Sequence, residues 1–184
     1  MADKAAFRRE ISRLEQSLTR EQRLESDELL RRNFLCHPQV SRAETILLFA
    51  GMGVEVDTRP LLEVLEQEGK RLCLPRCLPG NAMEARRYDG ARLVRHRYGM
   101  LEPDLDCPLV DKAQIDLILV PALCYDRRCF RLGRGGGFYD RYLADFQGFT
   151  LGLCRQVLLR DAVPVEPWDQ RVDAVLTERE QFGR

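Results

Sequence analysis

The segment best equipped for chemistry is a glycine loop that contains two arginines, RLGRGGGFYD at residues 131–140. Four glycines in five residues permit positive φ angles and a close ligand approach, so successive backbone N–H groups can turn toward one anion. Arg131 and Arg134 add fixed positive charge, and a helix that begins just after the loop would add its positive end. The loop matches neither the Walker A motif nor the dinucleotide GxGxxG fingerprint. It predicts a phosphate site, with a flexible turn as the alternative.

Cysteine chemistry is not indicated, although the chain has seven cysteines. The odd number, without a secretion signal, argues against a disulfide framework. Cys73 and Cys77 are separated by three residues and Cys124 and Cys129 by four. No CxxC motif or histidine cluster accompanies them, so the spacing does not predict a zinc site. Buried thiols are the better interpretation.

Length and charge limit the classes of protein to consider. The chain has 184 residues, with 29 basic and 29 acidic side chains, which predicts one domain over residues 1–184. A zero formal charge argues against a nucleic-acid coat or a membrane-surface protein. No apolar run reaches the roughly 18 residues that span a bilayer, and the first residues lack a signal peptide's apolar region. We expect a cytoplasmic monomer that acts on small molecules, without nucleic-acid or membrane partners.

The amino-terminal part has the rhythm of two amphipathic helices. Apolar residues recur at helical spacing from Phe7 to Leu18, which predicts the first helix. Thr19 and Gln22 form a capping-box signature ahead of the second helix, which extends to about residue 35. The two helices are nearly balanced in charge, so we expect a solvated helical hairpin.

After these helices the sequence alternates between short apolar strands and helices. A strand at 45–50, a helix at 58–69 and a strand at 72–75 form a β-α-β unit, whose strands should be parallel with a right-handed crossover. Hairpin strands, at a sheet edge or as an excursion from the sheet, are expected at 76–100. Further strands are expected at 115–120, 150–154 and 174–176, and a helix at 139–146. The predicted fold is α/β: a mostly parallel open sheet with helices on both faces, in a Rossmann-like three-layer arrangement.

In such a sheet, ligands bind outside the carboxyl ends of the strands. The segments that fall there are 51–58, 121–140 and 168–173, and the glycine loop lies in the second of them. Residues 76–97 carry an excess of arginine, which is either a solvated basic surface or an anion-binding rim.

The string RLGRGGGFYDRYL at residues 131–143 resembles the signature of the 5-formyltetrahydrofolate cyclo-ligase family, also called methenyltetrahydrofolate synthetases. The resemblance extends over nearly the whole chain. Further matches occur in order at Lys4 with Arg8 and at residues 55–58, 74–76, 99–103, 116–121 and 172–177. It implies an enzyme that cyclises 5-formyltetrahydrofolate to 5,10-methenyltetrahydrofolate with ATP and Mg²⁺, releasing ADP and phosphate. The implied route is phosphorylation of the formyl oxygen followed by attack of folate N10.

The resemblance also implies which residues bind ATP. Lys4 and Arg8 would contact the phosphates, although by themselves they would be interpreted as solvated cations on one helix face. Arg134 is the leading candidate for stabilising the transferred phosphoryl group. The loop residues that would wrap the nucleotide are Arg131, Leu132, Gly133, Arg134, Gly135, Gly136, Gly137, Phe138 and Tyr139.

Folate and metal contacts follow from the same resemblance. Met52 and Glu55 would line the folate pocket, and the loop from Arg134 through Gly135, Gly136 and Gly137 to Phe138 would also face the folate. Glu55 could instead simply begin a helix, and the aromatic rings could be core. Asp140 and Asp173 would hold Mg²⁺, with a helix-terminal charge and a loop-solvating residue as the alternatives. Gly136 and Trp168 stand where some relatives carry lysine and histidine, respectively.

Two other functions compete with the ligase. The first is a nucleotide- or phosphate-binding regulatory module that keeps the loop but catalyses nothing. The second is an isomerase or transferase of sugar phosphates or coenzyme A thioesters, which would need an acid/base or acyl-accepting carboxylate. Glu55 is the one residue in the predicted site that could serve in that role.

Overall fold

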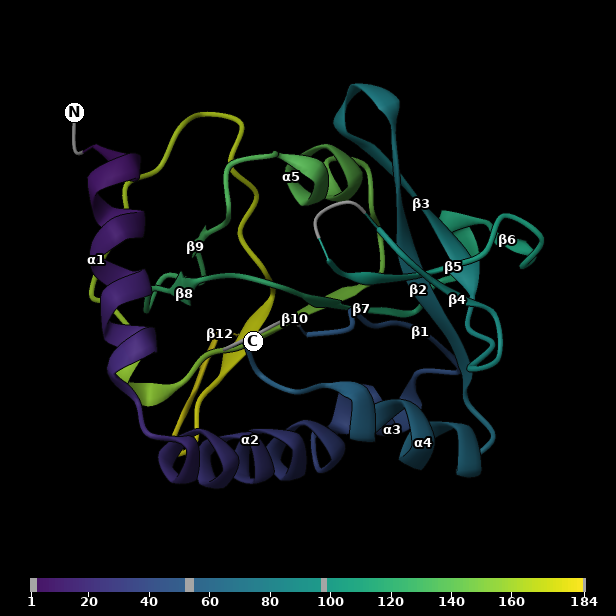
Figure 1. Cartoon of the computed structure of the whole chain (residues 1–184), viewed down its shortest axis with the longest axis horizontal. Helices are drawn as coiled ribbons and strands as arrows, with labels where there is room; N and C mark the ends of the chain where they lie inside the picture. The colour runs from purple at the N-terminus through teal and green to yellow at the C-terminus, as the bar shows by residue number, and fades with distance from the viewer. Residues whose placement is uncertain (1–2, 52–54, 97–98, 184) are drawn as a thin grey trace.

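The computed structural model describes residues 3–51, 55–96 and 99–183. Its centre is an eight-stranded sheet (Figure 1). The strands are β1 (Thr45–Leu47), β2 (Arg71–Leu78), β3 (Ala82–Arg87), β6 (Leu109–Val110), β7 (Leu117–Val120), β10 (Phe149–Leu153), β11 (Ala174–Leu176) and β12 (Gln181–Gly183). Their spatial order is β12-β11-β10-β7-β1-β2-β3-β6. The run from β11 to β2 is parallel, and the strands at both edges are antiparallel.

Within the described residues, five helices and two small hairpins surround this sheet. The helices are α1 (Lys4–Ser17), α2 (Arg20–Leu35), α3 (Pro38–Arg42), α4 (Arg59–Gln67) and α5 (Phe138–Leu143). The hairpins are β4 (Leu93–Arg95) with β5 (Leu101–Pro103), and β8 (Cys124–Tyr125) with β9 (Arg131–Leu132). Single 3-10 turns lie at Pro79–Asn81, Lys112–Gln114 and Gln156–Leu158. Among the described residues, none of the helices has both the length and the hydropathy of a membrane-spanning segment.

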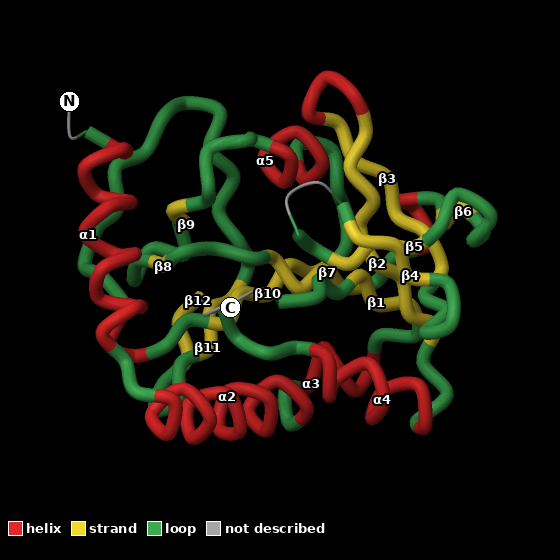
Figure 2. The backbone as a smooth tube through the Cα atoms, viewed as in Figure 1, coloured by secondary structure: helices red, strands yellow, loops and turns green. Residues whose placement is uncertain are grey.

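The sheet has an apolar core on each face. Successive side chains of a strand point to opposite faces, and in β7 Leu117 and Leu119 join one core while Ile118 and Val120 join the other. Helices α2, α3 and α4 cover the first of these faces, and α1 and α5 cover the second (Figure 2). The predicted α/β fold with helices on both faces is therefore confirmed.

The amino-terminal helices form as predicted, but the expectation of a hairpin is wrong. Thr19 caps α2, since its hydroxyl accepts from the Gln22 backbone N–H and its own N–H donates to Gln22 Oε1. Ile11 of α1 belongs to one core, whereas Leu30 and Phe34 of α2 belong to the other. The apolar stripe of α1 is thus buried against one face of the sheet and that of α2 against the other. The two helices lie at a steep angle to one another (Figure 1).

The β-α-β unit is confirmed, because β1 and β2 pair in parallel and α4 connects them. The antiparallel excursion expected at 76–100 is also present, as the β2–β3 and β4–β5 pairs. The β8–β9 hairpin, which carries the chain into the glycine loop, is an element that the sequence did not indicate. Helix α5 begins at Phe138 and has six residues, so it ends three residues earlier than the helix that the spacing of 139–146 predicts.

Candidate functional site

A pocket of about 640 Å³ lies at the carboxyl ends of β1 and β7, within the usual range for small-molecule sites. Its walls include parts of all three segments that the sequence placed at this edge: 51–58, 121–140 and 168–173. The predicted site residues that line it are Lys4, Arg8, Glu55, Arg131, Leu132, Gly133, Arg134, Gly135, Gly136, Gly137, Phe138, Tyr139 and Asp140. The fold therefore brings together residues more than 130 positions apart.

The glycine loop has the left-handed backbone that its composition predicted. Gly135 has φ 101° and Gly137 has φ 65°, a region that side chains disfavour. A Cβ at Gly135 would lie 3.4 Å from Arg8 Cζ, and one at Gly136 would lie 2.8 Å from the Phe138 ring. The loop is also held from outside, because Arg141 donates to the carbonyls of Gly136 and Asn81. Its shape leaves room for a ligand or an arginine beside the backbone.

The first helix contributes two cations to the pocket. Lys4 Nζ lies 2.7 Å from Glu166 Oε2 and 2.6 Å from Asp169 Oδ2. Partial burial acts to lower the pKa of Lys4, but the two carboxylates outweigh it and the pKa lies above its usual value. Arg8 Nε donates to the Gly133 carbonyl at 2.8 Å. Helix α1 is thereby bound to the glycine loop and to residues 166–169. The sequence did not identify residues 166–169 as partners of this helix.

Arg131 and Asp140 form an ion pair at the base of the loop. Arg131 Nη2 lies 2.6 Å from Asp140 Oδ1, and the arginine side chain is only 5% exposed. The same Oδ1 accepts from the Gln170 N–H at 3.2 Å. Both contacts use Oδ1, so Oδ2 is the oxygen of Asp140 that a cation could approach. Arg131 is buried because Asp140 compensates its charge.

Arg134 reaches across the pocket to Glu55. Its Nε lies 2.9 Å from Glu55 Oε1, and Nη2 contacts the same oxygen. The arginine side chain is 55% exposed and that of Glu55 is 12% exposed. The ion pair joins the glycine loop to the segment that follows β1, so the two predicted substrate-binding regions meet in this structure.

A buried charged pair, which no sequence motif indicates, lies behind this segment. Arg155 Nη1 is 2.9 Å from Asp27 Oδ1, with both side chains at least 93% buried, and Nη2 donates to the Glu55 carbonyl at 3.4 Å. Burial raises the pKa of Asp27 despite this partner. Glu15 of α1 is also buried, and burial together with the Glu55 charge raises its pKa. Position after the carboxyl end of β10 was the one sequence signal for Arg155.

The two aromatic residues of the loop lie both at the pocket wall and in the apolar core, which were the two alternatives for them. Phe138 and Tyr139 line the pocket and also pack against the core that α1 covers. Burial raises the pKa of Tyr139. Its hydroxyl is buried and has no hydrogen-bond partner in the described part of the chain.

Asp173 and Trp168 differ in where they lie relative to the pocket. Asp173 is not among the described residues that line the pocket; its Oδ2 accepts from the N–H and hydroxyl of Thr150, each at 2.9 Å, beside the amino end of β11. The expectation that Asp173 is the second magnesium ligand is therefore not supported by its position. Met52 lies outside the described residues. Trp168 lines the pocket and is 63% exposed.

Comparisons with known proteins agree with this architecture. The sequence model of the 5-formyltetrahydrofolate cyclo-ligase family matches residues 1–178. The 5-formyltetrahydrofolate cyclo-ligase of Escherichia coli (strain K12) is 33% identical over 91% of this chain and 96% of that protein, and that of Mus musculus is 29% identical over 95% and 93%. The solved 5,10-methenyltetrahydrofolate synthetase of Aquifex aeolicus superposes with a TM-score of 0.87 at 28% identity, covering 98% of this chain and 92% of that one.

Proposed function

This chain belongs to the 5-formyltetrahydrofolate cyclo-ligase family, and we propose that its pocket carries out the reaction for which the family is named. That reaction is the cyclisation of 5-formyltetrahydrofolate to 5,10-methenyltetrahydrofolate, coupled to conversion of ATP into ADP and phosphate. The relatives carry the names of ligases. These names argue against the regulatory module and against the isomerase and transferase alternatives.

The chemistry sets the demands on the pocket. A formamide oxygen is a poor leaving group, so its phosphorylation by ATP converts it into one that departs as phosphate. Folate N10 attacks the activated formyl carbon, the ring closes, and phosphate leaves. Nucleophile and acceptor both belong to substrates, so the protein supplies positioning and charge neutralisation. No protein nucleophile is needed.

One observation carries the proposal: five cationic side chains surround a left-handed glycine loop in a single pocket. They are Lys4, Arg8, Arg131, Arg134 and Arg141. Lys4, Arg131 and Arg134 face carboxylates, whereas Arg8 and Arg141 donate to the backbone carbonyls of Gly133 and Gly136. We propose that Lys4 and Arg8 bind the ATP phosphates and that the backbone of residues 132–137 lines the nucleotide site. Phosphate oxygens would replace the carboxylates as partners of these cations.

Arg134 is proposed as the catalytic residue. It lies on the exposed part of the loop and its guanidinium is already directed into the pocket by Glu55. Transfer of the phosphoryl group spreads charge over its oxygens, and a preorganised guanidinium stabilises that charge more than it stabilises the ground state. Glu55 and Phe138 are proposed to contact the folate, the first through its carboxylate and the second through its ring.

The donor chemistry of the pocket fits a magnesium ion at one point. Asp140 offers Oδ2, because Oδ1 already accepts from Arg131 and Gln170. Mg²⁺ is commonly held by one or two carboxylates, substrate phosphates and waters, so one protein carboxylate is sufficient. We propose Asp140 as the residue that holds it, directly or through water. The ion would neutralise charge on the triphosphate.

A direct assay tests the proposed function. Purified protein is mixed with 5-formyltetrahydrofolate, ATP and Mg²⁺, and the near-ultraviolet absorbance of the methenyl product is followed. We expect absorbance to rise with one ADP formed per methenyl group. An unchanged absorbance would refute the ligase, and ADP formation without methenyl product would indicate another ATP-dependent reaction. We also propose that the protein is a monomer, which size-exclusion chromatography tests, and that it is cytoplasmic, which cell fractionation tests.

A further inference from the structure

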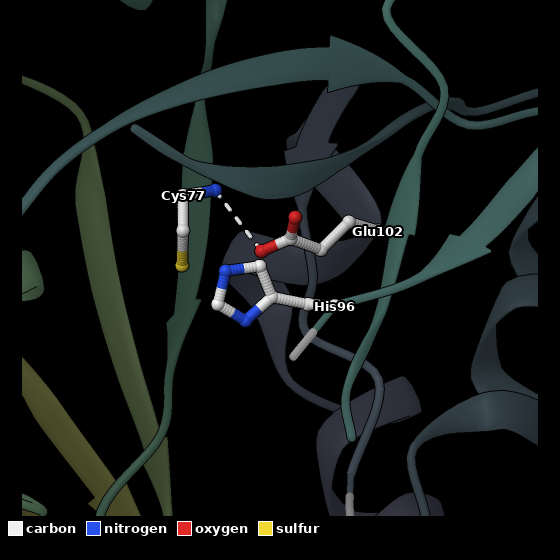
Figure 3. A group of neighbouring side chains, drawn as sticks. All are labelled: Cys77, His96 and Glu102. Atoms are coloured by element: carbon white, nitrogen blue, oxygen red, sulfur yellow. Dashed lines mark hydrogen bonds between the residues drawn. The ribbon is translucent and has the colours of Figure 1, made fainter. Parts of the chain in front are cut away.

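Three potential metal ligands, from strand β2 and from the β4–β5 hairpin, converge beside the pocket. Cys77 lies in β2, His96 follows β4 directly, and Glu102 lies in β5. Their ligand atoms all lie within 4.8 Å of one another. Figure 3 shows the imidazole of His96 beside both the Cys77 side chain and the Glu102 carboxylate. The β4–β5 hairpin thus brings two ligands to the strand that supplies the third.

The backbone holds this arrangement in place. Glu102 Oε1 accepts from the Cys77 N–H at 3.0 Å (Figure 3), which fixes β5 against β2. The turn between the two hairpin strands is closed by the His96 N–H, which donates to the Met100 carbonyl at 2.8 Å. Backbone N–H groups therefore position both the Glu102 carboxylate and the backbone of His96.

The kind of donor selects the kind of ion. One sulfur, one imidazole nitrogen and one carboxylate oxygen suit a borderline-soft divalent ion such as Zn²⁺, whereas Mg²⁺ and Ca²⁺ prefer oxygen throughout. Zinc bonds of about 2.0–2.3 Å place the ligand atoms of a tetrahedral site roughly 3.3–3.7 Å apart. The present separations of up to 4.8 Å would close on the ion by about 1 Å, a change within the reach of side-chain rotation.

Burial of Glu102 is a second, independent observation. The residue is only 2% exposed, and no lysine or arginine among the described residues forms an ion pair with it. A buried carboxylate is costly unless it is paired, coordinates a metal or takes up a proton. A divalent cation between Glu102 and Cys77 would compensate this charge.

Other thiols of the chain are poor competitors for a soft ion. Burial raises the pKa of Cys73, Cys124 and Cys154 to about 12, so their thiolate forms are disfavoured. Cys36 is exposed and is not part of the three-residue group. Cys77 is therefore distinguished by its neighbours and not by being the most accessible thiol.

We propose that Cys77, His96 and Glu102 bind one zinc-class divalent ion, with a fourth coordination position left for water or for a pocket ligand. Cys77 itself lines the main pocket, as do Met100 and Leu101 next to Glu102, so that position opens toward the substrates. Binding forms one bond each to sulfur, nitrogen and oxygen, and the thiol proton is released to solvent. The ion is additional to the magnesium proposed at Asp140 and does not depend on the ligase reaction.

Cobalt titration of the intact protein tests the site with the metal alone. Co²⁺ bound through a thiolate gives a charge-transfer band in the near ultraviolet, and we expect it to saturate at one ion per chain and to disappear when Zn²⁺ is added. Cys77→Ser should abolish the band. His96→Ala and Glu102→Gln should retain a thiolate but weaken cobalt binding by about 10-fold or more.

Cys36→Ser is the matched control, because it removes the exposed thiol and leaves the three ligands intact. It should keep both the band and the rise in Tm that saturating Zn²⁺ produces in the parent protein. The same zinc addition should leave the Tm of Cys77→Ser unchanged, and Cys77→Ser without metal reports whether that variant folds. A missing thiolate band in the parent, or a full band in folded Cys77→Ser, overturns the proposal.

Discussion

Replacement of Arg134 by alanine separates catalysis from stability at one position. The Arg134 guanidinium is half-exposed, with one carboxylate partner, Glu55. Exposed ion pairs of this kind contribute about 0–1 kcal/mol to folding. We therefore expect Arg134→Ala to lower the free energy of unfolding by no more than ~1 kcal/mol. The effect on the reaction should be much larger.

The size of the catalytic effect follows from the proposed role. Loss of one preorganised donor to a developing oxyanion lowers kcat by about 100-fold or more. Such a loss corresponds to about 2.7 kcal/mol in the activation barrier. The change should appear mainly in kcat, because Arg134 is paired with Glu55 before the substrates bind and is proposed to gain its strongest interaction in the transition state.

The assay is steady-state formation of the methenyl product, with chemical denaturation of the same protein samples. Arg71→Ala is the matched control, since Arg71 is similarly exposed, at 58%, and pairs with one carboxylate, Glu44. It should have the parent kcat and a comparable small change in stability. A decrease below threefold in the kcat of Arg134→Ala would refute the proposed role. A large loss of stability in that variant would show that the ion pair has a structural function instead.

Three further changes test other parts of the site. Asp140→Asn keeps an Oδ1 acceptor for Arg131 but removes the carboxylate charge, so the Mg²⁺ concentration for half-maximal activity should rise; superimposable magnesium titrations would exclude Asp140 as a ligand. Gly135→Ala places a side chain at φ 101° and beside Arg8, so we expect about 1–2 kcal/mol of destabilisation together with a higher KM for ATP. Gly69→Ala is the control, because Gly69 has a similar φ of 78° and an added Cβ would meet no atom within 4 Å. This variant should lose stability but keep the parent KM for ATP, and equal changes of KM in the two variants would contradict the role of the loop. Because the pKa of Glu15 is raised in the folded protein, this residue stabilises the fold at pH values below 4.5, its ordinary pKa, and the contribution is lost as the pH rises. The free energy of unfolding of Glu15→Gln, relative to the parent, should therefore increase from pH 4.5 upward. A difference between the two proteins that does not change with pH would be inconsistent with a buried carboxylate.

Much of the architecture could be predicted from local sequence patterns. The capping box at Thr19, the helix around Leu61 and the buried strands from Thr45 to Leu176 all follow from periodicity and turn chemistry, which act over a few residues. The glycine loop was identifiable for the same reason, because positive φ angles at Gly135 and Gly137 are a local requirement. The order of motifs along the chain then indicated the family.

The partners of individual side chains could not be read in this way. The ion pair between Lys4 and Asp169 joins residues 165 positions apart, and Asp173 turned toward Thr150 although Asp140 lies in the pocket. The amino-terminal helices also cover opposite faces of the sheet, which the helical spacing of their apolar residues does not indicate. These outcomes depend on how the edges of the sheet and the long segment 155–173 are packed.

The amino-acid sequence by itself determined the long helices and the central parallel strands, the place where the backbone must turn left-handed, and which family the chain resembles. Tertiary structure alone decided that Arg134 meets Glu55 and that Cys77, His96 and Glu102 lie together. The physical reason is one of range. Backbone preferences act between near neighbours, whereas ion pairs and metal ligands need side chains that only strand order and hairpin docking bring within a few ångströms.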